Sequence, residues 1–188
     1  MRAVVGLGNP GSRYAETRHN VGFMVTTELA RRASASWQSK FKGRYAKVFL
    51  GGREVWLLEP ETFMNLSGES VQPFAAFFRI APEEILVVHD DLDLPFATLR
   101  LKRGGGHGGH NGLRSLVDRL GSRDFARLRV GIGRPQKGDV SGFVLAPFAA
   151  QEREWLPGLV RDAADAALGC VSDGLLATQQ RVHTTSDG

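Results

Sequence analysis

The sequence predicts a single α/β domain over residues 1–188, built on a twisted mixed sheet, mostly parallel, that is flanked by helices. Short apolar runs alternate along the chain with segments of helical periodicity, which is typical of this class. Gly51-Gly52 joins two of the runs as a hairpin, and hairpin strands are antiparallel. The 188 residues, of which 42% are hydrophobic, suffice for one sizeable core and are few for two.

Each expected strand is a short apolar or alternating run that ends at a turn or at polar residues. The first run stops at Gly8-Asn9-Pro10-Gly11, and Ile85-Leu86-Val87-Val88 continues directly into acidic residues. The expected strands are residues 2–7, 44–50, 53–59, 84–89, 97–102 and 127–133.

Each expected helix has apolar residues three and four positions apart. The apolar faces are Val21, Met24, Val25 and Leu29; Val71, Phe74, Ala75 and Phe78; Leu113, Leu116, Val117 and Leu120; and Leu156, Leu159, Val160, Ala163 and Ala167. They predict helices over residues 20–32, 66–78 and 113–120 and in the carboxyl region. A last helix over 172–181 is expected before a flexible polar tail at about 183–188.

The composition argues against a secreted or membrane protein. Cys170 is the only cysteine, and its apolar neighbours predict a buried thiol rather than a nucleophile. No apolar stretch approaches the roughly 20 residues that span a bilayer, and the amino terminus lacks the layout of a signal peptide. We therefore expect a soluble, cytoplasmic protein.

Residues 104–115 read Gly-Gly-Gly-His-Gly-Gly-His-Asn-Gly-Leu-Arg-Ser and join a basic strand to an amphipathic helix. A plain connection needs fewer glycines. Glycine-rich backbone approaches ligands closely, and its N–H groups commonly face phosphate or carbonyl oxygens. The segment is therefore a candidate ligand-binding loop.

Positive charge is concentrated around this loop. The whole chain has a formal net charge of +4, whereas residues 98–137 contain ten Lys or Arg and only two Asp. A solvated basic surface is the common explanation for such a run. Beside a glycine-rich loop, the segregated charge favours a face that meets a nucleic-acid backbone.

Polar residues follow three of the predicted strands: Asn9, Asp90, and the pair His110-Asn111. Ligands of open α/β sheets bind outside the carboxyl ends of the strands. We therefore expect these residues to share one cleft.

The sequence contains two other candidate ligand sites. Gly6 to Gly11 has the spacing of a dinucleotide-binding loop, but Pro10 and the delayed helix do not fit, and no acid follows about 20 residues later. His107 and His110, with Asp90 or Asp91, are a candidate metal set, yet the loop does not present them at helical spacing and no cysteine joins them. Neither a cofactor nor a metal is expected.

Five sequence blocks occur in order between the amino terminus and about Phe148. They are Gly6-Leu7-Gly8-Asn9-Pro10-Gly11 with Tyr14 and Thr17-Arg18-His19-Asn20-Val21-Gly22; Thr62-Phe63-Met64-Asn65-Leu66-Ser67-Gly68; His89-Asp90-Asp91-Leu92-Asp93-Leu94-Pro95; residues 104–113; and residues 125–133. Together they resemble the bacterial-type peptidyl-tRNA hydrolases. The helical region after Phe148 carries no motif of its own.

The resemblance implies a phosphorylase/hydrolase-like fold and hydrolysis of the ester between a peptide's carboxyl group and the 3′-terminal ribose of tRNA, which returns the tRNA to translation. It also implies peptidyl-tRNA as the nucleic-acid partner, a monomer without an obligate protein partner or a membrane, and no cofactor.

The residue types agree with such chemistry. With no cysteine motif, Gly-x-Ser-x-Gly elbow or metal cluster in the sequence, an activated water is the economical nucleophile. By resemblance His19 is the base and Asp90 its carboxylate partner. Imidazole, with an ordinary pKa of about 6.5, accepts a proton near neutral pH, and a carboxylate on the far ring nitrogen fixes its tautomer. An isolated histidine would more often be structural; the surrounding block favours catalysis.

The resemblance also assigns substrate-binding residues. An asparagine amide donates and accepts hydrogen bonds without a charge, which suits a peptide group or a carbonyl. Asn65 and Asn111 each precede an apolar periodic segment, so a helix N-cap is an equally open interpretation for both. The expected set is Asn9, Tyr14, Met64, Asn65, His110 and Asn111, with Tyr14 and Met64 as apolar walls, His110 as support for the loop or the tRNA end, and His107 and His89 left as structural.

The expected tRNA-binding residues are Arg100, Lys102, Arg103 and Arg129. They match the family's basic positions loosely, since the family favours lysine where this chain has Arg100. They would position tRNA phosphates while the glycine-rich loop admits the 3′ end. Residues 135–143 are either a connector or a lid over the cleft.

Two further functions are alternatives for this sequence. A non-catalytic RNA-binding module of the same fold is disfavoured because Asn9, His19, Asp90 and Asn111 are all present. A metal-dependent esterase or peptidase that uses His107 and His110 predicts activity that a chelator removes.

Overall fold

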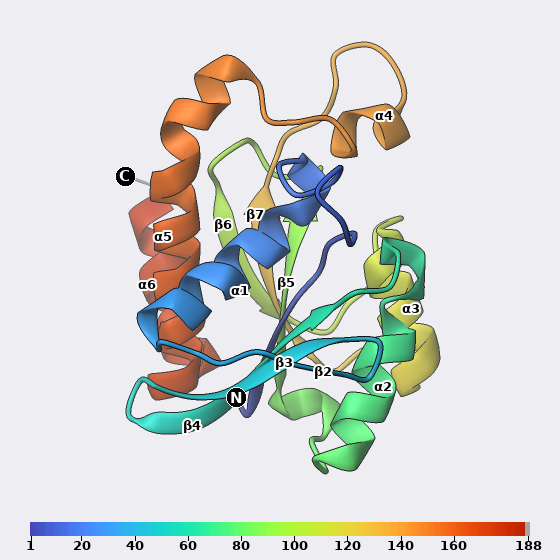
Figure 1. Ribbon diagram of the computed structural model, residues 1–188. Coiled ribbons are helices and arrows are strands. Elements are labelled where there is room, and N and C mark those ends of the chain that lie inside the picture. The colour runs from blue at the N-terminus through green and yellow to red at the C-terminus, as the bar shows by residue number, and fades with distance from the viewer. Residues whose placement is uncertain (187–188) are drawn as a thin grey trace.

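A twisted sheet lies between two layers of helices in the computed structural model, which describes residues 1–186 (Figure 1). The described residues form seven strands in the order β2-β3-β4-β1-β5-β7-β6. Their bounds are β1 Ala3–Gly6, β2 Gln38–Lys40, β3 Gly43–Leu50, β4 Arg53–Pro60, β5 Ile85–Asp91, β6 Leu99–Arg103 and β7 Ala126–Gly131.

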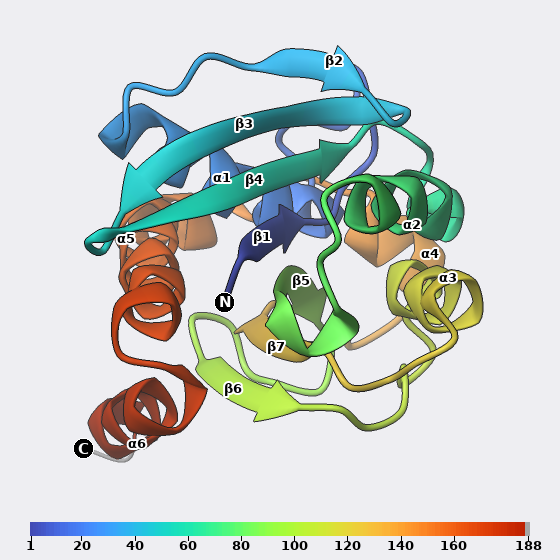
Figure 2. The ribbon, with the colours of Figure 1, turned by 90° about the horizontal axis from the view of Figure 1, so that it is seen from below.

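The helices divide between the two faces of the sheet. Helices α1, α5 and α6 cover one face and α2 and α3 the other, as the views from the front and from below both show (Figures 1 and 2). Their bounds are α1 Val21–Arg32, α2 Gly68–Phe77, α3 Asn111–Leu120, α4 Val140–Val144, α5 Ala150–Ser172 and α6 Leu175–Ser186, with 3₁₀ turns η1 Arg18–Asn20, η2 Met64–Leu66 and η3 Pro82–Glu84. The single α/β domain predicted from the sequence is confirmed.

The sheet is mixed, as predicted. Its centre, β4, β1, β5 and β7, is parallel, whereas β2 with β3, β3 with β4, and β6 with β7 pair antiparallel. The hairpin around Gly51-Gly52 is confirmed, and both glycines have positive φ. Parallel pairing is therefore confined to the central strands, whose carboxyl ends meet at one edge.

Helix α1 packs unusually close to β1 because glycines face each other at the crossing. A Cβ atom on Gly22 would lie 2.6 Å from the backbone N and O of Leu7, and one on Gly6 would lie 2.5 Å from Thr26 Oγ1. The close approach holds the amino end of α1, and with it η1, against the carboxyl ends of β1 and β5.

The direction of β6 corrects one interpretation of the sequence. The glycine-rich loop was placed at the ligand-binding edge because it follows a strand. However, β6 is antiparallel to β7, with Leu99 opposite Val130 and Arg103 opposite Ala126, so β6 ends at the opposite edge. The loop of residues 104–110 then runs back across the sheet, and α3 begins at the edge where β5 ends. His110 lies in the cleft because the loop leads back to this edge.

Strand β2 and helix α4 are among the short elements that the sequence did not predict. Strand β2 consists of three exposed polar residues and pairs with β3 through Phe41 and Lys42, which both have positive φ without being glycine or asparagine. It thus carries neither the apolar pattern of a strand nor the usual turn residues. Helix α4, only five residues long, begins in the segment interpreted as a connector or lid and ends one residue beyond it.

The carboxyl region forms two helices, as expected, but with other bounds. Helix α5 begins at Ala150, where Glu152 accepts a hydrogen bond from Ala149 N, and continues past Pro157. Gly174, at φ +92°, separates it from α6. Helix α6 extends through Ser186, into the stretch expected to be a tail, and residues 187–188 of that stretch lie outside the described residues.

Within residues 1–186, none of the helices combines the length and the apolar character needed to cross a membrane. Cys170 on α5 is fully buried, in agreement with the expected core thiol.

Candidate active site

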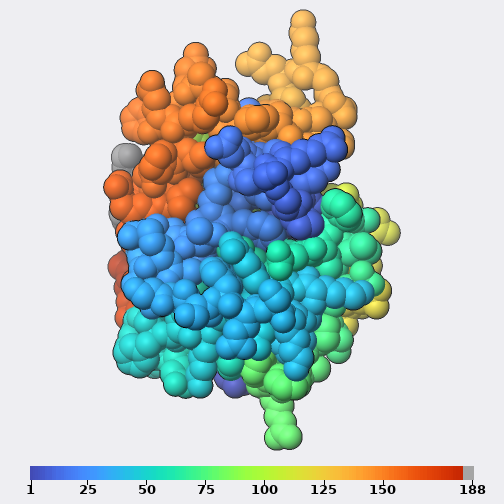
Figure 3. Space-filling model, in the orientation of Figure 1, coloured from blue at the N-terminus to red at the C-terminus, as the bar shows by residue number. Residues whose placement is uncertain are grey.

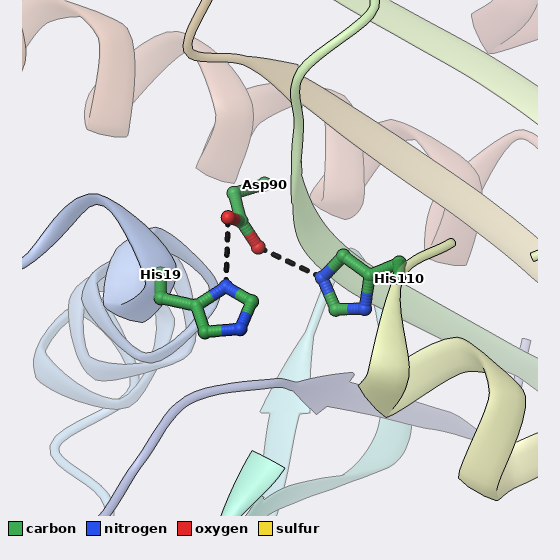
Figure 4. A group of neighbouring side chains, drawn as sticks. All are labelled: His19, Asp90 and His110. Carbon is green, nitrogen blue, oxygen red and sulfur yellow. Dashed lines mark hydrogen bonds and ion pairs between the residues drawn. The ribbon is translucent and has the colours of Figure 1, made fainter. Parts of the chain in front are cut away.

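The carboxylate of Asp90, at the end of β5, lies between two imidazole rings (Figure 4). His19 Nδ1, from η1, lies 2.8 Å from Asp90 Oδ2, and His110 Nε2, from the start of α3, lies 2.8 Å from Asp90 Oδ1. Asp90 is only 2% exposed. Burial opposes its ionisation, but the two neighbouring histidines outweigh it and hold the pKa of Asp90 well below its usual range.

His110 has a defined tautomer because it caps α3. Its Nδ1 accepts hydrogen bonds from Gly112 N at 3.1 Å and Leu113 N at 3.3 Å, so the ring proton lies on Nε2 and is donated to Asp90. The N-cap interpretation of Asn111 is therefore wrong: the cap is His110, and Asn111 is the first residue of the helix.

Asn65 does not cap a helix either. It lies inside η2, and Ser67 directly precedes α2. Both Asn65 and Asn111 are exposed and line the same cavity, and among the described residues no hydrogen bond engages either side-chain amide. Their amides are thus available to a bound molecule.

Since His19 Nδ1 is directed at Asp90, its Nε2 lies on the far side of the ring (Figure 4). A carboxylate partner favours the proton on Nδ1 and leaves the lone pair on Nε2. His19 lines the cavity, so the arrangement can accept a proton from a group bound there.

Asn9 joins two walls of the cleft through hydrogen bonds. Its backbone N and O both bond to the side chain of Asn20, each at 2.9 Å, and its Oδ1 accepts from Met64 N at 2.8 Å. Asn9 is 6% exposed. It fixes η2, and thereby Met64 and Asn65, relative to η1.

A cavity of about 570 Å³ unites most of the predicted site residues at the carboxyl edge of the central strands. The predicted residues that line it are Asn9, Tyr14, His19, Met64, Asn65, Asp90, Lys102, His110, Asn111 and Arg129. Arg100 and Arg103 lie outside this lining. Arg103 Nη1 donates to the carbonyls of Glu83 and Asp124 at 3.1 Å, near the opposite edge of the sheet.

The basic end of the cavity lies beneath the glycine-rich loop. Arg129 donates to Asp91 Oδ2 at 2.7 Å, and burial together with Arg127 and Arg129 lowers the pKa of Lys102. Arg127 was not singled out from the sequence. It is 1% exposed, and its guanidinium donates to Gly106 O at 2.6 Å and to Gly105 O at 2.8 Å. Arg127 and Arg129 are two residues apart on β7, so their side chains lie on the same face of the strand. This spacing could have identified Arg127 from the sequence.

Two further histidines line the cavity. His89 is buried, and its Nδ1 donates to the carbonyl of Asp90 at 2.8 Å. Burial, with His110 nearby, lowers the pKa of His89 to about 3, so this side chain is neutral. His107 Nδ1 accepts from Gly109 N at 3.0 Å and thus takes part in shaping the loop.

The structure brings together a different set of potential metal ligands from the one that the sequence indicated. The ligand atoms of His19, Asp90 and His110 lie within 4.8 Å of one another, and His107 is not among them. A metal-bound nitrogen must be unprotonated. Since helix capping places the proton of His110 on Nε2, metal binding there would require loss of the bonds from Gly112 and Leu113.

Part of the segment from 135 to 143 does border the cavity. Val140, Ser141 and Val144 of α4 line it, as does Leu145 directly after the helix. Figure 3 shows the orange segment that contains α4 above the blue segment that contains η1.

The fold and the cleft define a single-domain α/β protein with a histidine–carboxylate pair, the arrangement of a general-base hydrolase. A family model described as peptidyl-tRNA hydrolase matches residues 3–187. Peptidyl-tRNA hydrolases of Renibacterium salmoninarum and Nocardia farcinica are 49% and 50% identical to the chain over 185 and 183 residues, in each case 96% of this chain and 95% of the relative.

A crystal structure of peptidyl-tRNA hydrolase from Acinetobacter baumannii matches with a TM-score of 0.90 and 41% identity, covering 97% of this chain and 94% of that one. The chain belongs to the peptidyl-tRNA hydrolase family, which confirms the resemblance found in the sequence blocks. It is an ester hydrolase that acts on peptidyl-tRNA.

Proposed function

We propose that His19 and Asp90 catalyse hydrolysis of the ester between a peptide, or an N-blocked aminoacyl group, and the 3′-ribose of tRNA, through an activated water and without a metal. The observation that carries the proposal is the 2.8 Å bond between His19 Nδ1 and Asp90 Oδ2 at the wall of the cavity. It leaves His19 Nε2 as the base.

In the proposed reaction, a water bound near His19 Nε2 gives this nitrogen a proton while its oxygen attacks the ester carbonyl carbon. The resulting tetrahedral intermediate collapses with cleavage of the bond to the ribose 3′ oxygen, which takes the proton from His19. The products are a free peptide carboxyl group and the 3′ hydroxyl of tRNA. The Asp90 carboxylate stabilises the imidazolium between the two proton transfers.

The substrate's carbonyl and peptide groups are assigned to the asparagines. The exposed amides of Asn65 and Asn111 donate to the developing oxyanion or to the peptide backbone, and Asn9 orients η2 beneath them. Tyr14 and Met64 supply apolar walls. His110 holds the second oxygen of Asp90, so we assign it to support of the loop and the pair.

The tRNA phosphates are assigned to the basic end of the cavity. Lys102 and Arg129 line it and are the best placed of the expected tRNA-binding residues. Arg100 and Arg103 lie outside the cavity lining, so their role would be with phosphates further along the acceptor arm.

We further propose that the protein works as a monomer without an obligate protein partner and in the cytoplasm. Family membership supports the location, since peptidyl-tRNA arises in translation.

The test is release of peptide from an N-blocked aminoacyl-tRNA by the wild type and by His19→Ala, each with and without a chelator. We expect release that resists the chelator and is lost in His19→Ala, while tRNA binding persists. Turnover retained by His19→Ala would contradict the assignment of the base, and loss with the chelator would favour a metal at His19, Asp90 and His110.

A further inference from the structure

The side chain of Arg18, next to His19 in η1, is buried against the segment that carries α4. Its Nη1 donates to Phe143 O at 3.1 Å, and its Nη2 pairs with Glu152 Oε1 at 3.0 Å. The guanidinium lies 4.0 Å from the centre of the Phe143 ring and 5.9 Å from that of Phe148. Arg18 is only 7% exposed, so these contacts form in an environment with little water.

Backbone contacts join the same two segments. Arg18 N donates to Ala146 O at 3.0 Å, and Thr17 forms an isolated antiparallel bridge with Pro147. Glu152 also accepts from Ala149 N at 2.9 Å, so the carboxylate that binds Arg18 is fixed at the start of α5. Several residues between positions 143 and 152 thus contact Arg18 or its neighbour Thr17.

The other side of α4 faces the cleft. Val140, Ser141, Val144 and Leu145 line the cavity, and Val140 and Leu145 are 42% and 39% exposed. A helix of five residues has too few internal hydrogen bonds to hold itself in place. The position of this wall therefore depends on what α4 packs against: Val144 joins the hydrophobic core, and Arg18 binds the carbonyl and the ring of Phe143.

Turn η1 thus connects three parts of the cleft through three consecutive residues. Arg18 binds the α4 segment, His19 binds Asp90 on β5, and Asn20 binds the backbone of Asn9. Resting on the proposed role of His19, we propose that Arg18 is a positioning residue that holds α4 as a substrate-contacting wall at a fixed distance from the base.

If Arg18 has this role, its loss should change KM more than kcat. Without Arg18 the wall would loosen, while His19 would keep its bond to Asp90 and η1 would keep the bonds of Asn20 to Asn9. Substrate binding should weaken more than turnover, and the pH dependence of kcat should keep its midpoint. A purely structural role would instead reduce the fraction of folded enzyme, which lowers apparent kcat and leaves KM unchanged.

The experiment compares Arg18→Met, which keeps much of the side-chain length, with Arg18→Lys and with the exposed neighbour control Arg153→Met. Steady-state hydrolysis of N-blocked aminoacyl-tRNA gives KM and kcat across pH, and hydrogen exchange reports on the amides of residues 139–146. Phe143→Leu leaves Arg18 in place and removes the aromatic ring against which it stacks. This variant tests the same contact if Arg18→Met does not fold.

In Arg18→Met we expect KM to rise about tenfold, as loss of a cation–π contact and a charged hydrogen bond implies, with faster exchange over 139–146 and with kcat within about threefold of the wild type. Arg18→Lys and Phe143→Leu should show smaller changes of the same kind, and Arg153→Met none. An unchanged KM despite faster exchange, or an altered KM with unaltered exchange, would overturn the proposal. Failure of the catalytic assignment is distinguished by His19→Ala, whose α4 exchange should remain that of the wild type.

Discussion

The side-chain amide of Asn20 binds the backbone of Asn9 at both of its polar groups. Asn20 Oδ1 accepts from Asn9 N and Asn20 Nδ2 donates to Asn9 O, each at 2.9 Å. Asn20 is 1% exposed, so neither bond competes with bulk water. The loop after β1 and the turn before α1 are thereby locked together beside His19.

Asn20→Asp tests this lock with almost no change in volume. A carboxylate still accepts from Asn9 N but faces Asn9 O without a proton to donate, in a buried position. We expect the free energy of unfolding to fall by about 2–3 kcal/mol, and kcat/KM to fall with it. Urea denaturation measures the first and ester hydrolysis the second. Because a protonated carboxyl can donate, the deficit relative to the wild type should shrink as the pH falls; a deficit independent of pH would contradict this explanation.

Asp90→Asn should inactivate the enzyme through the tautomer of His19. His110 must donate from Nε2, because two backbone amides occupy its Nδ1. The new amide would turn its oxygen to His110 and its NH₂ to His19 Nδ1, which forces the proton of His19 onto Nε2 and removes the base. We expect kcat to fall by about 10²–10⁴-fold with a smaller change in KM. The control is Asp118→Asn on α3; equal activity of Asp90→Asn and wild type would rule out the pair.

The lowered pKa of His89 should make the free energy of unfolding depend on pH. Burial lowers its pKa in the folded state to about 3, from about 6.5 in an unfolded chain. Between these values the unfolded chain binds more protons, so stability is complete above about pH 6.5 and is lost as the pH falls toward about 3.

The measurement is the free energy of unfolding from pH 7 to pH 4, above the range in which Asp90 adds its own loss. His89→Asn retains a donor for the carbonyl of Asp90 and has no titrating ring. Its stability should fall less steeply than that of the wild type, for which His89 contributes up to about 1.4 kcal/mol per pH unit. Identical slopes would show that His89 is not kept neutral by the fold.

Cys170 should be unreactive in the native protein. Burial raises the pKa of its thiol to about 11, and the side chain is fully buried in α5. The thiolate is the reactive form, so alkylation at pH 8 should proceed only as fast as the region opens. Labelling should become rapid in denaturant, and since Cys170 is the only cysteine, its rate reports on α5 alone. Rapid labelling of the folded protein would refute this burial.

The sequence predicted the site residues that directly follow strands of the sheet. It predicted less well the features that depend on contacts between residues distant in the sequence. Asn9, Asp90 and His110 were expected to share a cleft, and the structure brings them together. The reason given for His110 was wrong, since the direction of β6 is set by its pairing with β7 and not by local sequence. For the same kind of reason, the N-cap interpretation that was open for Asn65 and Asn111 did not hold: the cap of α3 is His110, whose ring bonds both the first amides of the helix and Asp90 on β5. The contacts of Arg18 and Arg127 join residues that are distant in the sequence or carried by irregular loops, which periodicity does not report.

Arg127 offers the last test, because one buried guanidinium holds the glycine-rich loop. It donates to Gly105 O and Gly106 O and lies 4.6 Å from the centre of the Phe125 ring. Arg127→Met would leave both carbonyls without this donor. We expect a loss of about 2–4 kcal/mol in unfolding free energy, faster hydrogen exchange over residues 104–110 and a higher KM for the tRNA substrate.

The unfolding free energy and the loop exchange of Arg127→Lys should lie between those of the wild type and of Arg127→Met, because an ammonium group lacks the planar fork that reaches both carbonyls. Arg123→Met, an exposed change in the preceding turn, is the matched control and should leave loop exchange unaltered. If Arg127→Met lost stability with no change in exchange over 104–110, the arginine would stabilise the sheet rather than the loop, and the glycines alone would account for the loop's shape.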